Sequence, residues 1–106
     1  MNNEFEIKVL QIVEKIPFGK VTTYGEIARA CGLRASARMV GWILNANRYN
    51  SNFPFHRVVN RNGELTGRYH FSTPTLMKEL LLSEGIEFED EKVNLKKHLW
   101  IPIVLY

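Results

Sequence analysis

The stretch TYGEIARACGLRASARMVGWILNA, residues 23–46, holds two short helical patterns joined by a glycine. Thr23 and Glu26 have the spacing of a capping box, in which the Thr23 hydroxyl accepts from the Glu26 amide and the Glu26 side chain reaches back. Gly32 ends the first pattern, and a second helix is predicted from about Ser36 to about Ala46. Two short helices joined by a tight, glycine-containing turn predict a helix-turn-helix.

Amphipathic helices are predicted on both sides of this unit. Apolar residues recur at helical spacing over residues 5–16, and Pro17-Phe18-Gly19 ends that helix. Further along, Thr73-Pro74 places proline at the favoured first position of a helix that Gly85 ends. Residues 96–106 are expected to form a short helix and an extended end that covers the core.

A β-hairpin is predicted between the helix-turn-helix and the helix that follows Thr73-Pro74. Asn62-Gly63 is a strong turn signal, because both residues tolerate positive φ, and residues 58–60 and 64–66 flank it as candidate strands. A hairpin that follows a helix-turn-helix is typical of the wing of a winged-helix domain. The expected fold is therefore mainly α with a small β-hairpin, a single winged helix-turn-helix-like domain over residues 1–106.

The composition excludes several classes of protein. Hydrophobic residues make up 45% of the chain, which is ordinary for a soluble domain, and no apolar run reaches the length of a membrane span. The polar and acidic start, Met1 to Glu4, is no secretory signal, so a cytoplasmic location is expected. The single cysteine, Cys31, excludes an internal disulfide and a multi-cysteine metal site. Neither a metal nor a cofactor is expected.

The net charge of +3 is unevenly distributed along the chain. Residues 15–68 contain nine Lys or Arg and two acids, a balance of +7, so the remainder carries −4. A basic middle and an acidic end suggest one face that meets phosphates and one that does not. From charge alone, a mixed solvated surface is an equally good interpretation.

Several short pieces of the sequence, in their order and spacing, resemble the DNA-binding domain of the O6-alkylguanine-DNA alkyltransferases, also called methylated-DNA-protein-cysteine methyltransferases. The resemblance covers roughly residues 5–86 and implies the winged helix-turn-helix-like fold of the C-terminal alkyltransferase domain. No single piece would identify the family. The matching pieces are residues 17–28, 37–41, Asn47, 54–59, Gly63 and 83–85.

The resemblance places Phe55 where the family has its nucleophile. In the family, the residue between Pro54 and His56 is a cysteine that takes the alkyl group from guanine, whereas Phe55 has no lone pair with which to attack. A replaced cysteine is the pattern of the alkyltransferase-like proteins, although tryptophan or alanine is more usual there. His56 and Glu84 match the pair that deprotonates the cysteine through a water. Without a thiol, they are expected to act as a structural pair.

The resemblance also implies a DNA-binding surface. A guanine altered at O6 must be rotated out of the duplex to be examined, and Arg38 matches the arginine that fills the vacated space. A phosphate contact is the alternative for Arg38, and an aromatic core position is the alternative for Tyr24, which matches a tyrosine that crowds the target nucleotide. For Gly41, close approach of the helix to the minor groove and tight packing on the first helix are both open. The expected DNA-binding residues are Tyr24, Ala35, Ser36, Arg38, Met39 and Gly41.

A base pocket is implied beside this surface. Phe55 either offers its ring to the flipped base, a stacking contact worth about 1–3 kcal/mol, or fills the pocket. Asn47 and Arg57 are expected to brace the turn that carries Phe55. The expected lining residues are Tyr24, Phe55, Val58, Arg68 and Tyr69.

The leading hypothesis is a non-enzymatic sensor that binds O6-alkylguanine in duplex DNA through the minor groove, flips the base and signals nucleotide excision repair. Its expected partners are double-stranded DNA containing alkylated guanine and nucleotide excision repair proteins, and a monomer without membrane contact is expected. One alternative is a methylated-DNA-protein-cysteine methyltransferase with Cys31 as acceptor, although the apolar surroundings predicted for Cys31 favour an inert thiol. Another is a winged-helix regulator without lesion preference.

Overall fold

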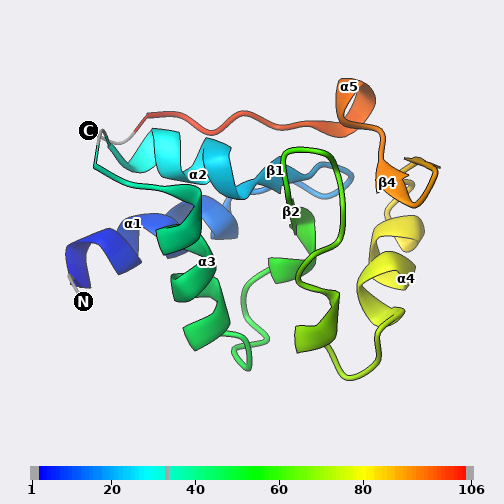
Figure 1. Ribbon diagram of the computed structural model, residues 1–106, viewed down its shortest axis with the longest axis horizontal. Helices are drawn as coiled ribbons and strands as arrows, with labels where there is room; N and C mark the ends of the chain where they lie inside the picture. Colours follow the sequence, from blue (N-terminus) through cyan, green and yellow to red (C-terminus); the bar gives the residue numbers. More distant parts are fainter. Residues whose placement is uncertain (1–2, 33, 105–106) are drawn as a thin grey trace.

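The computed structural model describes residues 3–32 and 34–104. Figure 1 shows the helices α1, α2 and α3 gathered at one end of the molecule, with α4 and the β3–β4 hairpin at the other. Both ends of the described chain, the start of α1 and the tail after α5, lie on the side of the molecule where these three helices gather (Figure 1). The elements are α1 (Asn3–Glu14), β1 (Thr22–Thr23), α2 (Tyr24–Cys31), α3 (Ala37–Ala46), η1 (Phe55–Arg57), β2 (Val58–Val59), η2 (Arg68–His70), α4 (Leu76–Ser83), β3 (Phe88–Glu89), β4 (Lys92–Val93) and α5 (Leu95–His98).

The caps of α2 and α3 explain where the helix-turn-helix begins. The Thr23 hydroxyl accepts from the Glu26 amide at 3.0 Å, and the Ser36 hydroxyl accepts from the Met39 amide at 3.2 Å. The reciprocal half of the predicted capping box is not formed. The Glu26 carboxylate instead accepts from Arg29 Nε at 2.9 Å, because that cation lies one turn along the same helix.

Two groups of buried side chains hold the elements together. The first joins the inner faces of α1, α2 and α3, where Val9, Ile27 and Val40 are fully buried. The second lies under α4, where Met77 and Leu81 pack with Val21 just before β1, Val59 of β2 and Val93 of β4. Burial of apolar side chains at helical spacing is the main source of stability for such short helices.

The predicted hairpin over residues 58–66 is wrong in its pairing. Val58 and Val59 form β2, which pairs in parallel with Thr22 and Thr23 of β1. The Asn62-Gly63 turn does form, but the segment after it makes no strand. One bond joins the two arms, from the Asn60 amide to the Glu64 carbonyl at 3.1 Å, and the Gly63 carbonyl accepts from the Val93 amide at 2.9 Å, which docks the turn on β4. The antiparallel pair of the fold is β3 with β4, around a turn in which Asp90 and Glu91 have positive φ.

The predicted helix after Thr73-Pro74 and the predicted tail are both present. α4 begins at Leu76, two residues beyond Pro74, and Gly85 ends it with φ +83° while the Ile86 amide returns to the Leu81 carbonyl at 3.1 Å. Beyond α5, the Trp100 amide donates to the Val21 carbonyl at 2.7 Å, and the tail runs extended along β1 and α2 (Figure 1). None of the described helices is both long and apolar enough to span a bilayer.

Candidate nucleic-acid interface

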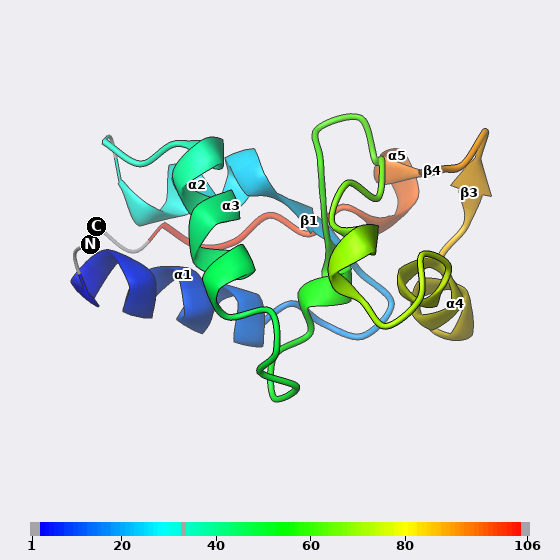
Figure 2. The same ribbon diagram turned by 60° about the horizontal axis from the view of Figure 1, so that its bottom comes forward.

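A pocket of about 930 Å³ opens between α3 with the loop that follows it and the η2 region. Figure 2 shows α3 in front of α1 and α2, and the loop after α3 extending away from the core. The volume lies near the upper end of the range for ligand sites in proteins. Glu14 is the one acid among the described lining residues, which also include Tyr24, Gly41, Phe53, Phe55, His56 and Tyr69.

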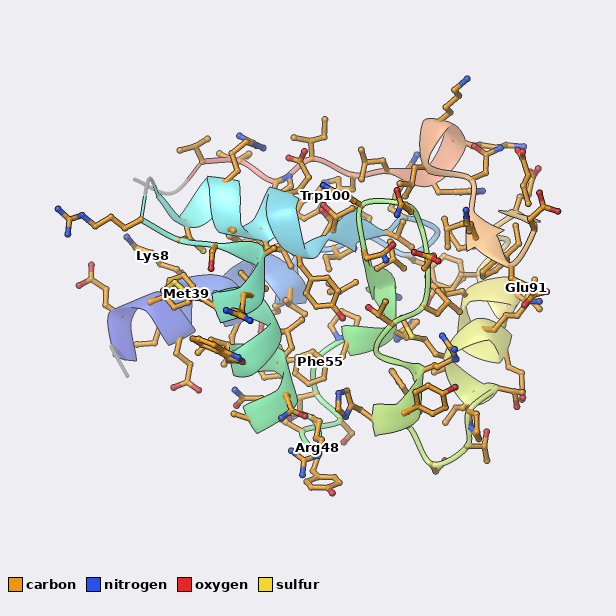
Figure 3. All side chains as sticks on the ribbon, in the orientation of Figure 1. Lys8, Met39, Arg48, Phe55, Glu91 and Trp100 are labelled. Carbon is orange, nitrogen blue, oxygen red and sulfur yellow. The ribbon has the colours of Figure 1, made fainter. Side chains whose placement is uncertain are left out.

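Phe55 forms part of the wall of this pocket and does not fill it. Its ring stacks on that of Phe53, with centroids 5.7 Å apart and planes inclined by 27°. Both rings are half-buried and pack against the first core group, so the core fixes their position. Figure 3 places Phe55 beside α3 and above Arg48. An aromatic face of this kind can stack on a planar ligand.

The Glu84 carboxylate joins the turn that carries Phe55 to two other segments. It accepts from His56 Nε2 at 2.6 Å, from Arg57 Nε at 3.0 Å and from the Gly19 amide at 2.9 Å, and its side chain is only 5% exposed. Arg57 Nη1 also donates to the Ile16 carbonyl at 2.9 Å. These bonds connect the end of α4, the turn after α1 and η1.

The charge state of Glu84 follows from these partners. Burial raises the pKa of Glu84, but the hydrogen bonds from Arg57, the Gly19 amide and His56 outweigh it and bring the pKa below its usual range. The carboxylate is therefore ionised at neutral pH. Its partners also occupy the lone pairs that a general base would need.

The expected DNA-binding residues are divided between the pocket and the start of α3. Tyr24 and Gly41 line the pocket, and the Tyr24 hydroxyl lies against Gly67, where an added Cβ would come within 3.4 Å. Arg38 is exposed in the first turn of α3. The remaining three, Ala35, Ser36 and Met39, lie at or just before that same turn, and Ser36 caps it.

The structure excludes one of the two interpretations of Gly41. A Cβ added to Gly41 would have no neighbour within 4 Å, so tight packing on another helix is not the reason for this glycine. Gly41 faces open space at the edge of the pocket. Close approach of another molecule to the helix backbone stays a prediction.

Three expected site residues lie elsewhere. Val58 is 1% exposed in the core, because β2 pairs with β1 and directs it inward. Arg68 does not line the pocket, because its guanidinium lies 4.6 Å over the Tyr69 ring and donates to the Leu65 carbonyl. Asn47 does not brace the Phe55 turn. Its amide donates to the Ile43 carbonyl at 2.8 Å and to Glu6 at 3.0 Å, which ties the end of α3 to α1.

Sequence reasoning missed the loop after α3 as part of the pocket wall. Arg48 and Tyr49 line the pocket, the Arg48 guanidinium lies 4.6 Å over the Tyr49 ring, and Tyr49 is 84% exposed. An arginine beside a tyrosine in a polar loop just before Pro54 is the signal that could have indicated them.

Comparisons with known proteins agree with this geometry. A family model described as the DNA-binding domain of 6-O-methylguanine DNA methyltransferase matches residues 4–86. Alkyltransferase-like protein 1 of Schizosaccharomyces pombe is 37% identical over 94% of this chain and 97% of the relative. A DNA base-flipping protein of Escherichia coli is 37% identical over 92% of this chain and 75% of the relative.

The S. pombe protein has also been solved in complex with damaged DNA containing O6-carboxymethylguanine. That crystal structure superposes with a TM-score of 0.79 over 94% of this chain and 97% of that one. The chain therefore belongs to the 6-O-methylguanine DNA methyltransferase DNA-binding domain family, among its alkyltransferase-like members.

Proposed function

We propose that this protein is a non-enzymatic DNA-damage recognition protein. It binds O6-alkylguanine in duplex DNA through the minor groove, flips the base into the pocket beside α3 and marks the lesion for nucleotide excision repair. The observation that carries the proposal is the pocket itself, with Phe55 in its wall at the position before His56. The names of the two relatives and the damaged DNA in the S. pombe crystal structure support it.

The alternative is an alkyl-transferring enzyme, since relatives of the chain include methylated-DNA-protein-cysteine methyltransferases, one of them 39% identical. The one cysteine of the chain does not suit that chemistry. Cys31 lies in α2, is 7% exposed and belongs to the first core group. Burial raises the pKa of the Cys31 thiol, and Lys8 only partly offsets this, which disfavours the nucleophilic thiolate.

Mass spectrometry separates the two functions. After incubation with a duplex containing O6-methylguanine, the mass of the protein is expected to be unchanged, because no accessible thiolate lines the pocket. A Cys31→Ser variant controls for chemistry at sulfur. A methyl adduct on the wild-type protein that is lost in Cys31→Ser would establish the enzyme and reject the sensor.

Lesion preference is the direct test of the sensor. In a titration with two otherwise identical duplexes, we expect tighter binding when guanine is replaced by O6-methylguanine. Arg38→Ala is expected to weaken binding to the lesion duplex by about tenfold, equivalent to about 1.4 kcal/mol, and to affect the guanine duplex less, because only the extruded base leaves a space for the guanidinium. Arg34→Ala controls for the loss of one exposed positive charge near α3, and it is expected to weaken binding to both duplexes by the same factor. Equal affinity of the wild-type protein for the two duplexes would contradict the proposal.

Gly41→Ala tests whether the helix backbone approaches DNA. The substitution is expected to raise the free energy of unfolding by about 0.5–1 kcal/mol, because alanine is the better helix former and the added methyl group meets nothing. The same methyl group is expected to weaken DNA binding several-fold by holding the duplex away from α3. Urea unfolding and a duplex titration measure the two effects. A variant that is both more stable and equally tight in DNA binding would show that α3 does not approach DNA at Gly41.

A further inference from the structure

The outer face of α3 carries one large apolar side chain that the fold does not use. Trp42 is 55% exposed and belongs to neither core group. Within residues 3–32 and 34–104, no hydrogen bond or ring contact engages its indole. Trp42 does not line the pocket either, although the adjacent Gly41 does. Trp42 therefore belongs neither to a core group nor to the pocket wall.

The position of Trp42 relative to Arg38 restricts what can cover it. The two residues are four apart in α3, so they share one face of the helix and are separated by about 6 Å along its axis. The other helix neighbours of Trp42 at this spacing, Met39, Asn45 and Ala46, are uncharged. A duplex that lies along this face of α3 at Arg38 comes within one helical turn of Trp42.

The charge of this region favours DNA over a protein as the occupant. α3 contains no acidic residue, and Arg34, Arg38 and Arg48 lie before, within and after it. The acids near α3 are Glu6, which accepts from Asn47, and Glu14 in the pocket wall. The acidic residues that follow α4 are remote, as Figure 3 shows from the wide separation of Glu91 and Met39. A basic helix with an exposed indole fits a groove between two phosphate backbones.

We propose that Trp42 is a second DNA-contacting side chain of α3, which packs its indole against sugars and base edges of the minor groove one helical turn from Arg38. The proposal rests on the proposed function in that the Arg38 face of α3 is taken to meet the duplex. Because Trp42 lies outside the pocket, it increases affinity for duplex DNA without distinguishing an alkylated guanine from a normal one.

The two tryptophans of the chain provide a direct readout. Trp100 is half-buried against the first core group, whereas Trp42 faces solvent. Adding duplex DNA is expected to change the intrinsic fluorescence of the wild-type protein. In Trp42→Phe, which retains only Trp100, this change is expected to disappear. Retention of the full fluorescence change in Trp42→Phe would overturn the proposal.

Binding measurements test the energetic part. Trp42→Ala is expected to raise the Kd about tenfold for the guanine and O6-methylguanine duplexes alike, which leaves their ratio unchanged. Ile7→Ala is the matched control, because Ile7 of α1 is also 55% exposed, and it is expected to leave both Kd values unchanged. An unchanged Kd in Trp42→Ala would reject the contact.

The two proposals fail in different ways. One outcome is that the fluorescence change on adding DNA disappears in Trp42→Phe while the wild-type protein shows no lesion preference. That outcome would reject the sensor and support the Trp42 contact. Lesion preference in the wild-type protein, with unchanged duplex affinity in Trp42→Ala, would support the sensor and reject the contact.

Discussion

Replacing Glu84 with alanine is expected to lower the free energy of unfolding by about 3–5 kcal/mol, the largest effect of any single change proposed for this protein. The substitution removes the acceptor of His56, Arg57 and the Gly19 amide at once. The Arg57 side chain, only 16% exposed, would then lack its ion-pair partner. The turn after α1, η1 and the end of α4 would lose their common connection.

Urea unfolding measures this effect, and Glu91→Ala is its control. Glu91 also pairs with a cation, Lys78 at 2.8 Å, but its side chain is 80% exposed. Exposed pairs of this kind contribute about 0–1 kcal/mol. A Glu84→Ala effect no larger than that of Glu91→Ala would mean that the buried network does not hold the pocket wall in place.

The same carboxylate predicts how stability depends on pH. The pKa of Glu84 in the folded protein lies below its value in the unfolded chain, which is about 4.3. The stabilisation from Glu84 is therefore complete above that pH and is lost as the pH falls through the folded pKa. Glu84→Gln is expected to reduce the loss of stability below about pH 4.3. If the free energy of unfolding fell equally steeply with decreasing pH in Glu84→Gln and in the wild-type protein, this role of Glu84 would be contradicted.

The elements that local signals specify are those that the sequence predicted correctly. Thr23 and Ser36 cap α2 and α3, and Gly85 ends α4, because each of these residues acts within one turn of its own helix. The pairing of residues 58–66 depends instead on β1 and on Val93, which are distant in the sequence. A turn signal such as Asn62-Gly63 fixes a reversal of the chain but not the partner of each arm.

In the candidate site too, some residues were predicted correctly from the sequence and others depend on contacts with distant segments. The family resemblance indicated Tyr24, Phe55 and Tyr69, and all three line the pocket. It misplaced Val58, because the inward direction of that side chain is set by the β1 pairing. The exposure of Trp42 could not be read from the helical pattern, since positions 39–44 of α3 are almost continuously apolar and only the packing shows which of them face the core.

The second large effect is expected at Gly63. Gly63→Ala is expected to lower the free energy of unfolding by about 3 kcal/mol. An alanine is strained at positive φ, and its Cβ would also clash with neighbouring backbone atoms. Gly63 has φ +84°, and an added Cβ would lie 2.5 Å from the Val93 carbonyl oxygen and 3.0 Å from the Val93 nitrogen. Because backbone atoms surround the site, no side chain can rotate away to make room. The contact between this turn and β4 would have to open.

Gly25→Ala is the matched control for Gly63→Ala in urea unfolding. A Cβ on Gly25 would meet only the Thr23 hydroxyl at 3.9 Å, an ordinary contact in the first turn of α2. Its effect is therefore expected to be neutral or stabilising by up to about 1 kcal/mol. The Asn62-Gly63 turn is docked on β4 through the bond from the Val93 amide to the Gly63 carbonyl. Equal stability of Gly63→Ala and Gly25→Ala would show that this docking contributes little to the stability of the fold.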